Sequence, residues 1–354
     1  MTQTRKKKEL IYLRAFLCTM IVLTHILTQY MRDISGNDIS QLKVIYYVQN
    51  LFIFGTPCFI ILSQLLTTLN YSELKINYLV TRFKYIFLPY LIMGSFYCYS
   101  EARKLGDSFW HQLYQNVLLG YWYGYFIIVI LQYFILSYII YKISPRLFNS
   151  KILLLFSFFL QFGFLYLLHN NNSFTSNLHK YYPLSDNTFI LGWIFFFFLG
   201  GYIGYNYNKI IEYLKAFPIV ILVFSIISFL IFVFAFGKHD YWNVTSYTET
   251  LMLYHTFMFL MLLSLFIHFK KFIFGVVNMI NAFSFFIYLL HPIMTEYIYQ
   301  YTSIFINTTL IFIILSLITT IGICIGIGMI LREFYVCRFI IGKQPYKLKI
   351  NFTE

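Results

Sequence analysis

Two ionisable residues lie inside the first long apolar stretch of the chain, where a charge is costly. Arg14 and His25 stand eleven positions apart in YLRAFLCTMIVLTH, residues 12–25, and their neighbours are almost all apolar. At about 100° per residue, both side chains fall on one helix face, about 16 Å apart along the axis. Ionisable residues inside a membrane span usually serve a function, because they must be paired or hydrated. The alternatives are snorkelling to lipid headgroups for Arg14 and a neutral interhelical hydrogen bond for His25.

A second histidine occupies a similar position in a later apolar stretch. FSFFIYLLHPI, residues 283–293, places His291 about ten residues, or ~15 Å, into its helix, just before the helix-loosening Pro292. If both stretches enter from the cytoplasm, His25 and His291 lie at matching depth and can face one cavity. Histidine takes and returns a proton near neutral pH, as acyl transfer to a hydroxyl requires. We therefore predict both histidines as catalytic residues.

A third stretch could hold an anionic donor. FGTPCFIILSQ, residues 54–64, is followed by LVTRFKYIFLPY, residues 79–90. This order predicts a helix descending to the inner face, a basic turn and an ascending helix kinked at Pro89. Arg82 and Lys84 in that turn are candidates, with Arg14, for binding the phosphates of a donor. The alternative is that they are ordinary basic anchors at the cytoplasmic surface.

The elements that must position these residues are long apolar segments. Of the 354 residues, 60% are hydrophobic and only 11% are charged, whereas a soluble domain is about a quarter charged. Apolar runs of about 17 to 25 residues recur, which is the length that spans a ~30 Å hydrocarbon core. We therefore predict an all-α, polytopic integral membrane protein with one domain over 1–354. About ten transmembrane helices are expected, at 10–30, 44–69, 84–100, 117–141, 152–168, 187–207, 217–236, 251–268, 281–299 and 309–331.

The distribution of basic residues predicts the orientation of these spans. With the N-terminus inside, most of the 26 Lys and Arg residues fall in alternate, inner segments. The outer segments carry only Arg32, Lys43, Arg103, Lys104, Lys180 and Lys238. The positive-inside rule therefore predicts both termini in the cytoplasm. It also accounts for the net charge of +13 without a nucleic-acid partner.

Two loops expected on the outer side are rich in aromatic residues. They read YYPLSDN, residues 181–187, and KHDYWNVT, residues 238–245. Aromatic rings stack on sugar faces and carboxylates accept hydrogen bonds from hydroxyls. The candidates for binding a saccharide acceptor are therefore Tyr181, Tyr182, Asp240 and Trp242. The alternative is the belt of aromatic residues at the lipid–water interface.

Several signatures are missing from the sequence. It contains no Gly-x4-Gly-Lys-Ser/Thr, so the chain has no P-loop for ATP. It contains no HExxH, and its five cysteines form no CxxC pair. We therefore expect no metal site and no bound cofactor.

Together these stretches resemble the integral-membrane acyltransferase-3 family over nearly the whole chain. The resemblance rests on the spacing of Arg14 and His25 and on FGTPCFIILS, TRFKYIFLPY and FSFFIYLLHP. It implies a cytosolic acyl donor, usually acyl-CoA, and a sugar acceptor at the outer face. In that family the histidine of the first helix is essential to acyl transfer and the arginine binds the donor. The resemblance assigns these roles to His25 and Arg14.

Two positions depart from the pattern of that family. The serine of its second-helix motif is often followed by Gly, whereas Gln64 follows Ser63 here. The start of its fourth helix often reads His-x-Trp, whereas this chain reads GYWYGYF with Tyr121 and Trp122. Trp122 is a further candidate for acceptor binding. Neither departure touches the first helix.

Further stretches narrow the resemblance within the family. Members that work with poly-β-1,6-N-acetylglucosamine, a bacterial biofilm exopolysaccharide, are similar in FGTPCFIILSQLLTTLNY, YYPLS, DYWNVTS, GMILREFY and RFIIGKQPYKL. They are described both as exporters of the polymer and as O-succinyltransferases. The resemblance implies transfer of a succinyl or acetyl group from succinyl-CoA or acetyl-CoA to hydroxyls of the polymer. It places the protein among the lipids of the bacterial cell membrane. It also implies a membrane glycosyltransferase as a partner. The alternatives are export without acyl transfer and a structural role in positioning that glycosyltransferase.

Overall fold

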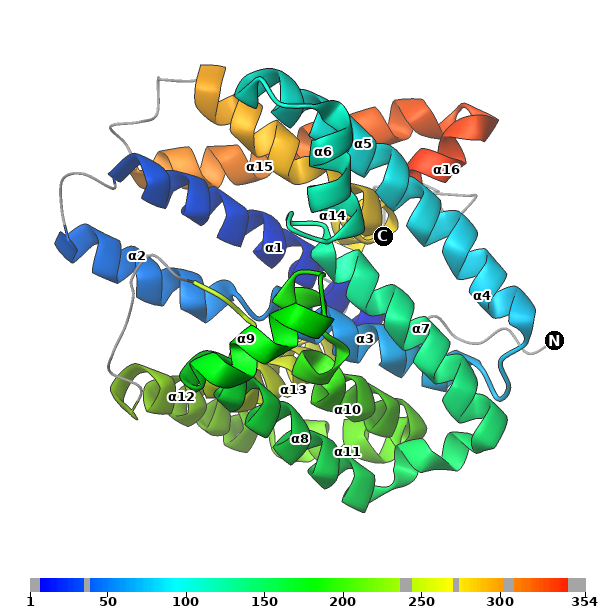
Figure 1. Cartoon of the computed structure of the whole chain (residues 1–354). Coiled ribbons are helices and arrows are strands. Elements are labelled where there is room, and N and C mark those ends of the chain that lie inside the picture. The colour runs from blue at the N-terminus through cyan, green and yellow to red at the C-terminus, as the bar shows by residue number, and fades with distance from the viewer. Residues whose placement is uncertain (1–6, 35–38, 236–243, 270–273, 302–308, 343–354) are drawn as a thin grey trace.

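The computed structural model describes residues 7–34, 39–235, 244–269, 274–301 and 309–342. Every regular element in these ranges is helical, and the long helices pack as a bundle (Figure 1). The α-helices are α1 (Lys8–Ile34), α2 (Ile39–Phe52), α3 (Gly55–Asn70), α4 (Ile76–Arg82), α5 (Leu88–Leu105), α6 (Phe109–Gln112), α7 (Tyr125–Ile143), α8 (Lys151–Asn170), α9 (Asn172–Tyr181), α10 (Ile194–Tyr205), α11 (Tyr207–Ala216), α12 (Pro218–Ala235), α13 (Met252–His268), α14 (Phe274–Tyr301), α15 (Thr309–Arg332) and α16 (Arg338–Ile341). Short turns join them: π-helical at Phe83–Phe87 and Leu113–Leu118, and 3-10 at Pro145–Asn149, Asp186–Thr188, Ile190–Trp193, Glu249–Leu251 and Tyr335–Cys337.

The apolar runs become helices because only a helix satisfies all of its own backbone hydrogen bonds in lipid. Among the described residues, eight helices are long and apolar enough to cross a membrane. A ninth span results if Ile190–Tyr205 and Tyr207–Ala216, bent by 91°, count as one. The prediction of a polytopic all-α membrane protein is confirmed. Nine of the ten expected spans have a counterpart, and 84–100 is the exception.

The expected span 84–100 lies in a helix that is less apolar but still runs between the two ends of the bundle. α4, the π-helical turn Phe83–Phe87 and α5 follow one another without a break. The π-helical turn comes directly before Pro89, whose ring nitrogen carries no proton for the helix ladder. At one end, the Lys84 ammonium lies 5.2 Å from the ring of Phe339. At the other, Lys104 donates to Glu296 of α14 over 2.6 Å.

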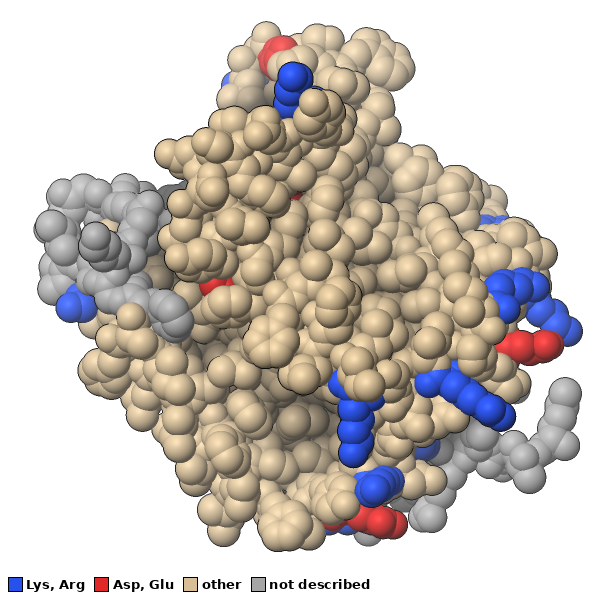
Figure 2. Space-filling model, turned by 60° about the horizontal axis from the view of Figure 1, so that its bottom comes forward, with Lys and Arg blue, Asp and Glu red and all other residues tan. Residues whose placement is uncertain are grey.

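Other contacts at the helix ends agree with the expected alternation of the segments. The Lys7 ammonium lies 3.6 Å from the ring of Tyr207, and the sequence assigns both residues to the inner side. His169 and Glu249, both assigned to the outer side, are joined over 2.9 Å. Each contact therefore joins segments predicted to share a side. Figure 2 shows a face on which uncharged side chains cover the middle and Lys and Arg lie towards the margins, as a lipid-embedded bundle requires.

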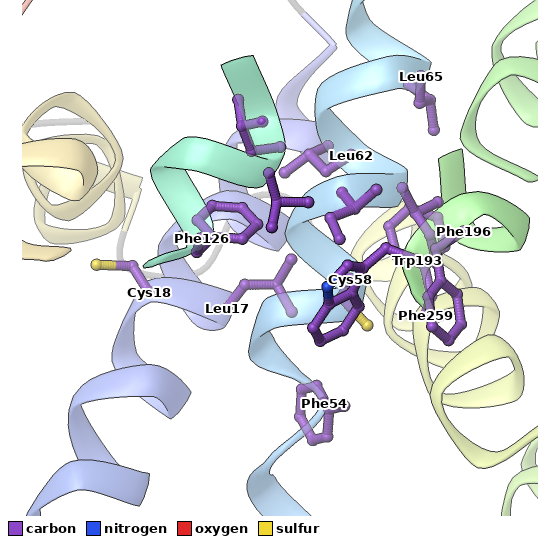
Figure 3. Packing of buried hydrophobic residues seen from close by; sticks show 14 of the residues in the cluster. Leu17, Cys18, Phe54, Cys58, Leu62, Leu65, Phe126, Trp193, Phe196 and Phe259 are labelled. Atoms are coloured by element: carbon purple, nitrogen blue, oxygen red, sulfur yellow. The ribbon is translucent and has the colours of Figure 1, made fainter. Parts of the chain in front are cut away.

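Two pairs of glycines have the spacing that favours close helix packing, and the structure gives the two pairs different surroundings. At Gly200 and Gly204 of α10, an added Cβ would collide with the backbone of α3. These glycines therefore let α10 and α3 approach closely, in the core that Figure 3 shows around Cys58, Leu62, Trp193 and Phe196. At Gly322 and Gly326 of α15, no described atom lies within 4 Å of an added Cβ, so this pair makes no close helix contact with the described part of the chain.

Candidate functional site

The two histidines predicted as catalytic lie side by side at the contact between α1 and α14. Their ring centroids are 4.9 Å apart and their planes meet at 66°. His291 is completely buried, whereas His25 is partly exposed and lines a cavity. The expected closeness of the two rings is found. A substrate in the cavity can touch His25 directly, while His291 stands behind it.

The orientation of His291 is fixed by the backbone of its own helix. Its Nδ1 lies 2.9 Å from the carbonyl oxygen of Ile287, so Nδ1 carries the proton and donates it. This leaves Nε2 with a free lone pair, and no described residue hydrogen-bonds to that buried atom. Pro292 follows at once and deprives the Tyr288 carbonyl of its helical N–H partner, which loosens the helix at this point. In this tautomer His291 can accept a proton at Nε2 but cannot donate one there.

Two tyrosines tie the histidine pair to the segment before α7. The Tyr123 hydroxyl donates to the Leu289 carbonyl over 2.8 Å, and the Tyr288 hydroxyl donates to the Tyr123 carbonyl over 2.8 Å. The ring of Tyr123 thereby lies 6.3 Å from that of His25 and 6.2 Å from that of His291. Sequence reasoning quoted GYWYGYF but did not single out Tyr123. In a chain with 33 tyrosines, no spacing signal distinguishes it.

Arg14 and Arg82 meet in one cavity, which we call the arginine cavity. It has a volume of about 240 Å³, and α1, α3, α4, α7 and α14 all contribute to its wall. Among the described residues, no Asp or Glu forms a salt bridge with either guanidinium. Arg82 instead lies 5.0 Å from the rings of Tyr78 and Phe134. Two cations without a carboxylate partner make this cavity suited to an anion.

Lys84, the third predicted donor-binding residue, lies apart from the arginine cavity. Its side chain is exposed and does not line the wall. Its ammonium is 5.8 Å from the ring of Tyr85 and 5.2 Å from that of Phe339. A part in donor binding for Lys84 stays a prediction.

A second cavity surrounds His25, and we call it the histidine cavity. It measures about 220 Å³, and its described lining carries hydroxyl, amide and imidazole groups but no Asp, Glu, Lys or Arg. The polar lining residues are Thr24, His25, Thr28, Gln49, Thr56, Tyr123, Tyr125, Asn187, Thr245, Ser246 and Tyr288. This lining suits a neutral ligand with many hydroxyl groups.

The two cavities adjoin at a shared wall of three side chains, which we call the constriction. Ile21, Phe126 and Tyr288 line both of them. The rings of Phe126 and Tyr288 are 5.8 Å apart and meet edge to face. Figure 3 shows Phe126 between Cys18 of α1 and Leu62 of α3, which line the arginine cavity with it. The face of α1 that carries Arg14, Cys18, Ile21 and His25 therefore connects the anion site to the histidine pair.

Three of the five residues predicted to bind an acceptor lie within the described ranges. Trp122 is only 6% exposed and donates from its ring nitrogen to the Tyr90 hydroxyl over 3.1 Å. Tyr181 is 79% exposed on the surface. Tyr182 is half-buried, shares a 2.7 Å hydrogen bond with Thr188, and has a pKa raised by burial. None of these three lines either cavity.

The remaining two acceptor candidates, Asp240 and Trp242, lie outside the described residues. Within the described ranges, no group of three or more His, Cys, Asp or Glu side chains is placed to hold a metal ion. These ranges therefore offer a cavity with two arginines next to a second cavity lined by His25.

Comparison with known proteins gives the family to which this chain belongs. Residues 7–329 match the family described as acyltransferase domain, so the chain belongs to the acyltransferase-3 family of membrane proteins. A protein of Staphylococcus aureus (strain MRSA252), named "Probable poly-beta-1,6-N-acetyl-D-glucosamine export protein", is 54% identical over 343 residues, which cover 97% of this chain and 98% of that protein. A Staphylococcus epidermidis protein of the same name is 55% identical over 347 residues, 98% of each chain. No solved structure matches the chain.

Proposed function

We propose that this protein transfers an acyl group from a cytosolic acyl-CoA-type thioester to a hydroxyl of a poly-β-1,6-N-acetylglucosamine chain. The observation that carries the proposal is the arrangement of an anion site and a histidine pair along one helix face. Arg14 and Arg82 line the first cavity, His25 lines the second, and both cavities share Ile21, Phe126 and Tyr288.

The arginine cavity is the proposed donor site. Phosphate groups of the donor pair with Arg14 and Arg82, which no described carboxylate neutralises. The thioester arm extends past the constriction towards His25. Succinyl-CoA and acetyl-CoA both satisfy this arrangement, because the recognition rests on the phosphates rather than on the acyl group.

The histidine cavity is the proposed site of reaction. A polymer hydroxyl attacks the thioester carbonyl carbon while His25 takes the hydroxyl proton. The carbon–sulfur bond then breaks, and the thiolate receives that proton from the imidazolium. The products are an O-ester on the polymer and a free thiol. His291 positions the His25 ring, because it lies 4.9 Å away but lines neither cavity.

Export of the polymer is the second candidate function, and the name of the staphylococcal relatives favours it. Export needs a path wide enough for a sugar chain through the bundle. The side chains of Ile21, Phe126 and Tyr288 form the shared wall of the two cavities. We propose that a slender thioester arm passes this constriction and that a polysaccharide does not.

The test is the ester content of the secreted polymer. A strain that lacks this protein is supplied with the wild type or with His25→Ala, and alkali-labile O-acyl groups on extracellular polymer are measured. We expect the variant to secrete polymer without the ester. Polymer retained inside the variant cells would favour export instead. Unchanged ester content would contradict the proposal.

A matched control uses a histidine that lines neither cavity. His111 is an exposed residue that pairs with Asp107 over 2.6 Å on the segment assigned to the outer side. We expect His111→Ala to leave both secretion and ester content unchanged.

A further inference from the structure

One buried polar atom beside the histidine pair has no partner. Gln49 of α2 is only 3% exposed and lines the histidine cavity. Its Nε2 donates to the Thr24 carbonyl over 3.0 Å and to the Thr28 hydroxyl over 2.6 Å. Its Oε1 is buried, and no described residue hydrogen-bonds to it.

The orientation of this amide is determined by its partners. A carbonyl oxygen only accepts, so the Gln49 atom that faces the Thr24 carbonyl must be the NH₂ group. Oε1 is then the amide atom left without a partner, on a residue that lines the histidine cavity. A buried acceptor without a donor costs free energy, so a ligand that donates an O–H or N–H to Oε1 would be bound more tightly.

Gln49 is also tied to the helix turn that carries His25. Thr24 precedes His25 directly, and Thr28 lies one turn further along α1. Both bonds of Nε2 therefore hold the Gln49 amide against the same turn. Because Gln49 and His25 line the same cavity, a ligand in that cavity can meet both residues.

We propose that Gln49 is a binding residue for the acceptor: its Oε1 accepts a hydrogen bond from a hydroxyl or amide N–H of a neutral sugar ring held beside His25. This inference rests on the proposed acyl transfer for its sugar. The rest of the lining agrees with a neutral sugar, because its described polar groups are hydroxyls, amides and one imidazole.

The test compares two buried glutamines. Gln64 is the control: it is also 3% exposed, but its Nε2 donates to Thr68 over 3.1 Å, its Oε1 accepts from Ser137 over 2.6 Å, and it lines neither cavity. Binding of a short β-1,6-linked N-acetylglucosamine oligosaccharide to purified, membrane-reconstituted wild type, Gln49→Leu and Gln64→Leu is measured by titration. Coenzyme A binding and thermal unfolding are measured in parallel.

We expect Gln49→Leu to raise the Kd of the oligosaccharide at least about fivefold, because a lone buried hydrogen bond is lost. Binding of coenzyme A stays unchanged in this variant. In Gln64→Leu, only the unfolding temperature falls. Where transfer is measured, Gln49→Leu raises the acceptor KM and leaves kcat nearly unchanged.

Titration with a β-1,6-linked glucose oligosaccharide, which lacks the N-acetyl group, identifies the sugar group that donates to Oε1. If Gln49→Leu weakens only the N-acetylated chain, the donor is the amide N–H; if it weakens both, the donor is a hydroxyl. Equal affinity of wild type and Gln49→Leu would overturn the inference, as would a wild type that binds neither oligosaccharide. Because binding is read without turnover, wild type that binds the sugar but transfers nothing would contradict only the proposed function.

Discussion

The imidazole ring of His25 stands edge-on to that of His291, with 4.9 Å between centroids and 66° between planes. Only His25 reaches a cavity, while the Nδ1 of His291 is engaged by the Ile287 carbonyl over 2.9 Å. In the proposed reaction this relationship divides the work: His25 exchanges the proton with the substrate, and His291 holds His25 in place.

The first prediction concerns this division. We expect His25→Ala to lower kcat for acyl transfer by about 10² to 10⁴, the usual worth of a positioned general base. His291→Ala lowers it less, because His291 acts through His25. The double variant is expected to be no worse than His25→Ala, since the two residues act as a unit. Additive losses in steady-state kinetics would mean that the two rings act independently.

The second prediction concerns the donor site. Arg14→Met or Arg82→Met is expected to raise the KM of the acyl donor about 10- to 100-fold, because each removes a charge-assisted hydrogen bond to phosphate. Lys84→Met is the matched control, because its exposed side chain does not line the arginine cavity. Donor binding is followed by titration with coenzyme A. If Lys84→Met raised the donor KM as much as Arg14→Met does, the donor site would lie at the surface rather than in the arginine cavity.

The third prediction concerns the constriction. Phe126→Trp enlarges a side chain that both cavities share, so it is expected to slow transfer while coenzyme A still binds. Phe59→Trp is the control, because Phe59 lines the arginine cavity alone. Single-turnover rates distinguish slower passage of the acyl arm from weaker binding of the donor. Equal rates for the two tryptophan variants would show that the acyl arm does not pass between the cavities.

The fourth prediction concerns helix packing. Gly200→Ala places a Cβ against the backbone of α3 and is expected to lower the free energy of unfolding by about 1 to 3 kcal/mol, as overpacking does. Gly322→Ala meets no described atom and is expected to be neutral or to stabilise α15 by about 0.5 to 1 kcal/mol. Thermal unfolding in detergent compares the two. A destabilised Gly322→Ala protein would indicate a contact at that face.

The spacing of residues predicts the parts of the site that lie on one helix. Arg14 and His25 are on one face of α1 because eleven residues make nearly whole turns, and that face does line both cavities. The depth argument allowed His25 and His291 to face one cavity: the two rings do lie side by side, but of the two only His25 lines the histidine cavity. The bundle could also be predicted, because apolar length and basic-residue distribution are properties of the chain alone.

Other parts of the site depend on how separate helices face one another. Gln49 is one of several polar residues in α2, and only its bonds to Thr24 and Thr28 of α1 reveal the free oxygen. Trp122 stands in a conspicuous motif, yet the fold buries its ring against Tyr90. Tyrosines and Pro89 likewise left 84–100 less apolar than the other spans, although that helix runs between the two ends of the bundle.

The most direct test of the central claim is acyl transfer by the purified protein in lipid nanodiscs. Acetyl-CoA or succinyl-CoA labelled in the acyl group is supplied with a β-1,6-linked N-acetylglucosamine oligosaccharide, and label in alkali-labile ester is counted. The wild type is expected to form the labelled ester, and His25→Ala to form none while still binding coenzyme A. Wild-type protein that binds both ligands yet transfers no label, or His25→Ala that transfers as fast as wild type, would contradict the account.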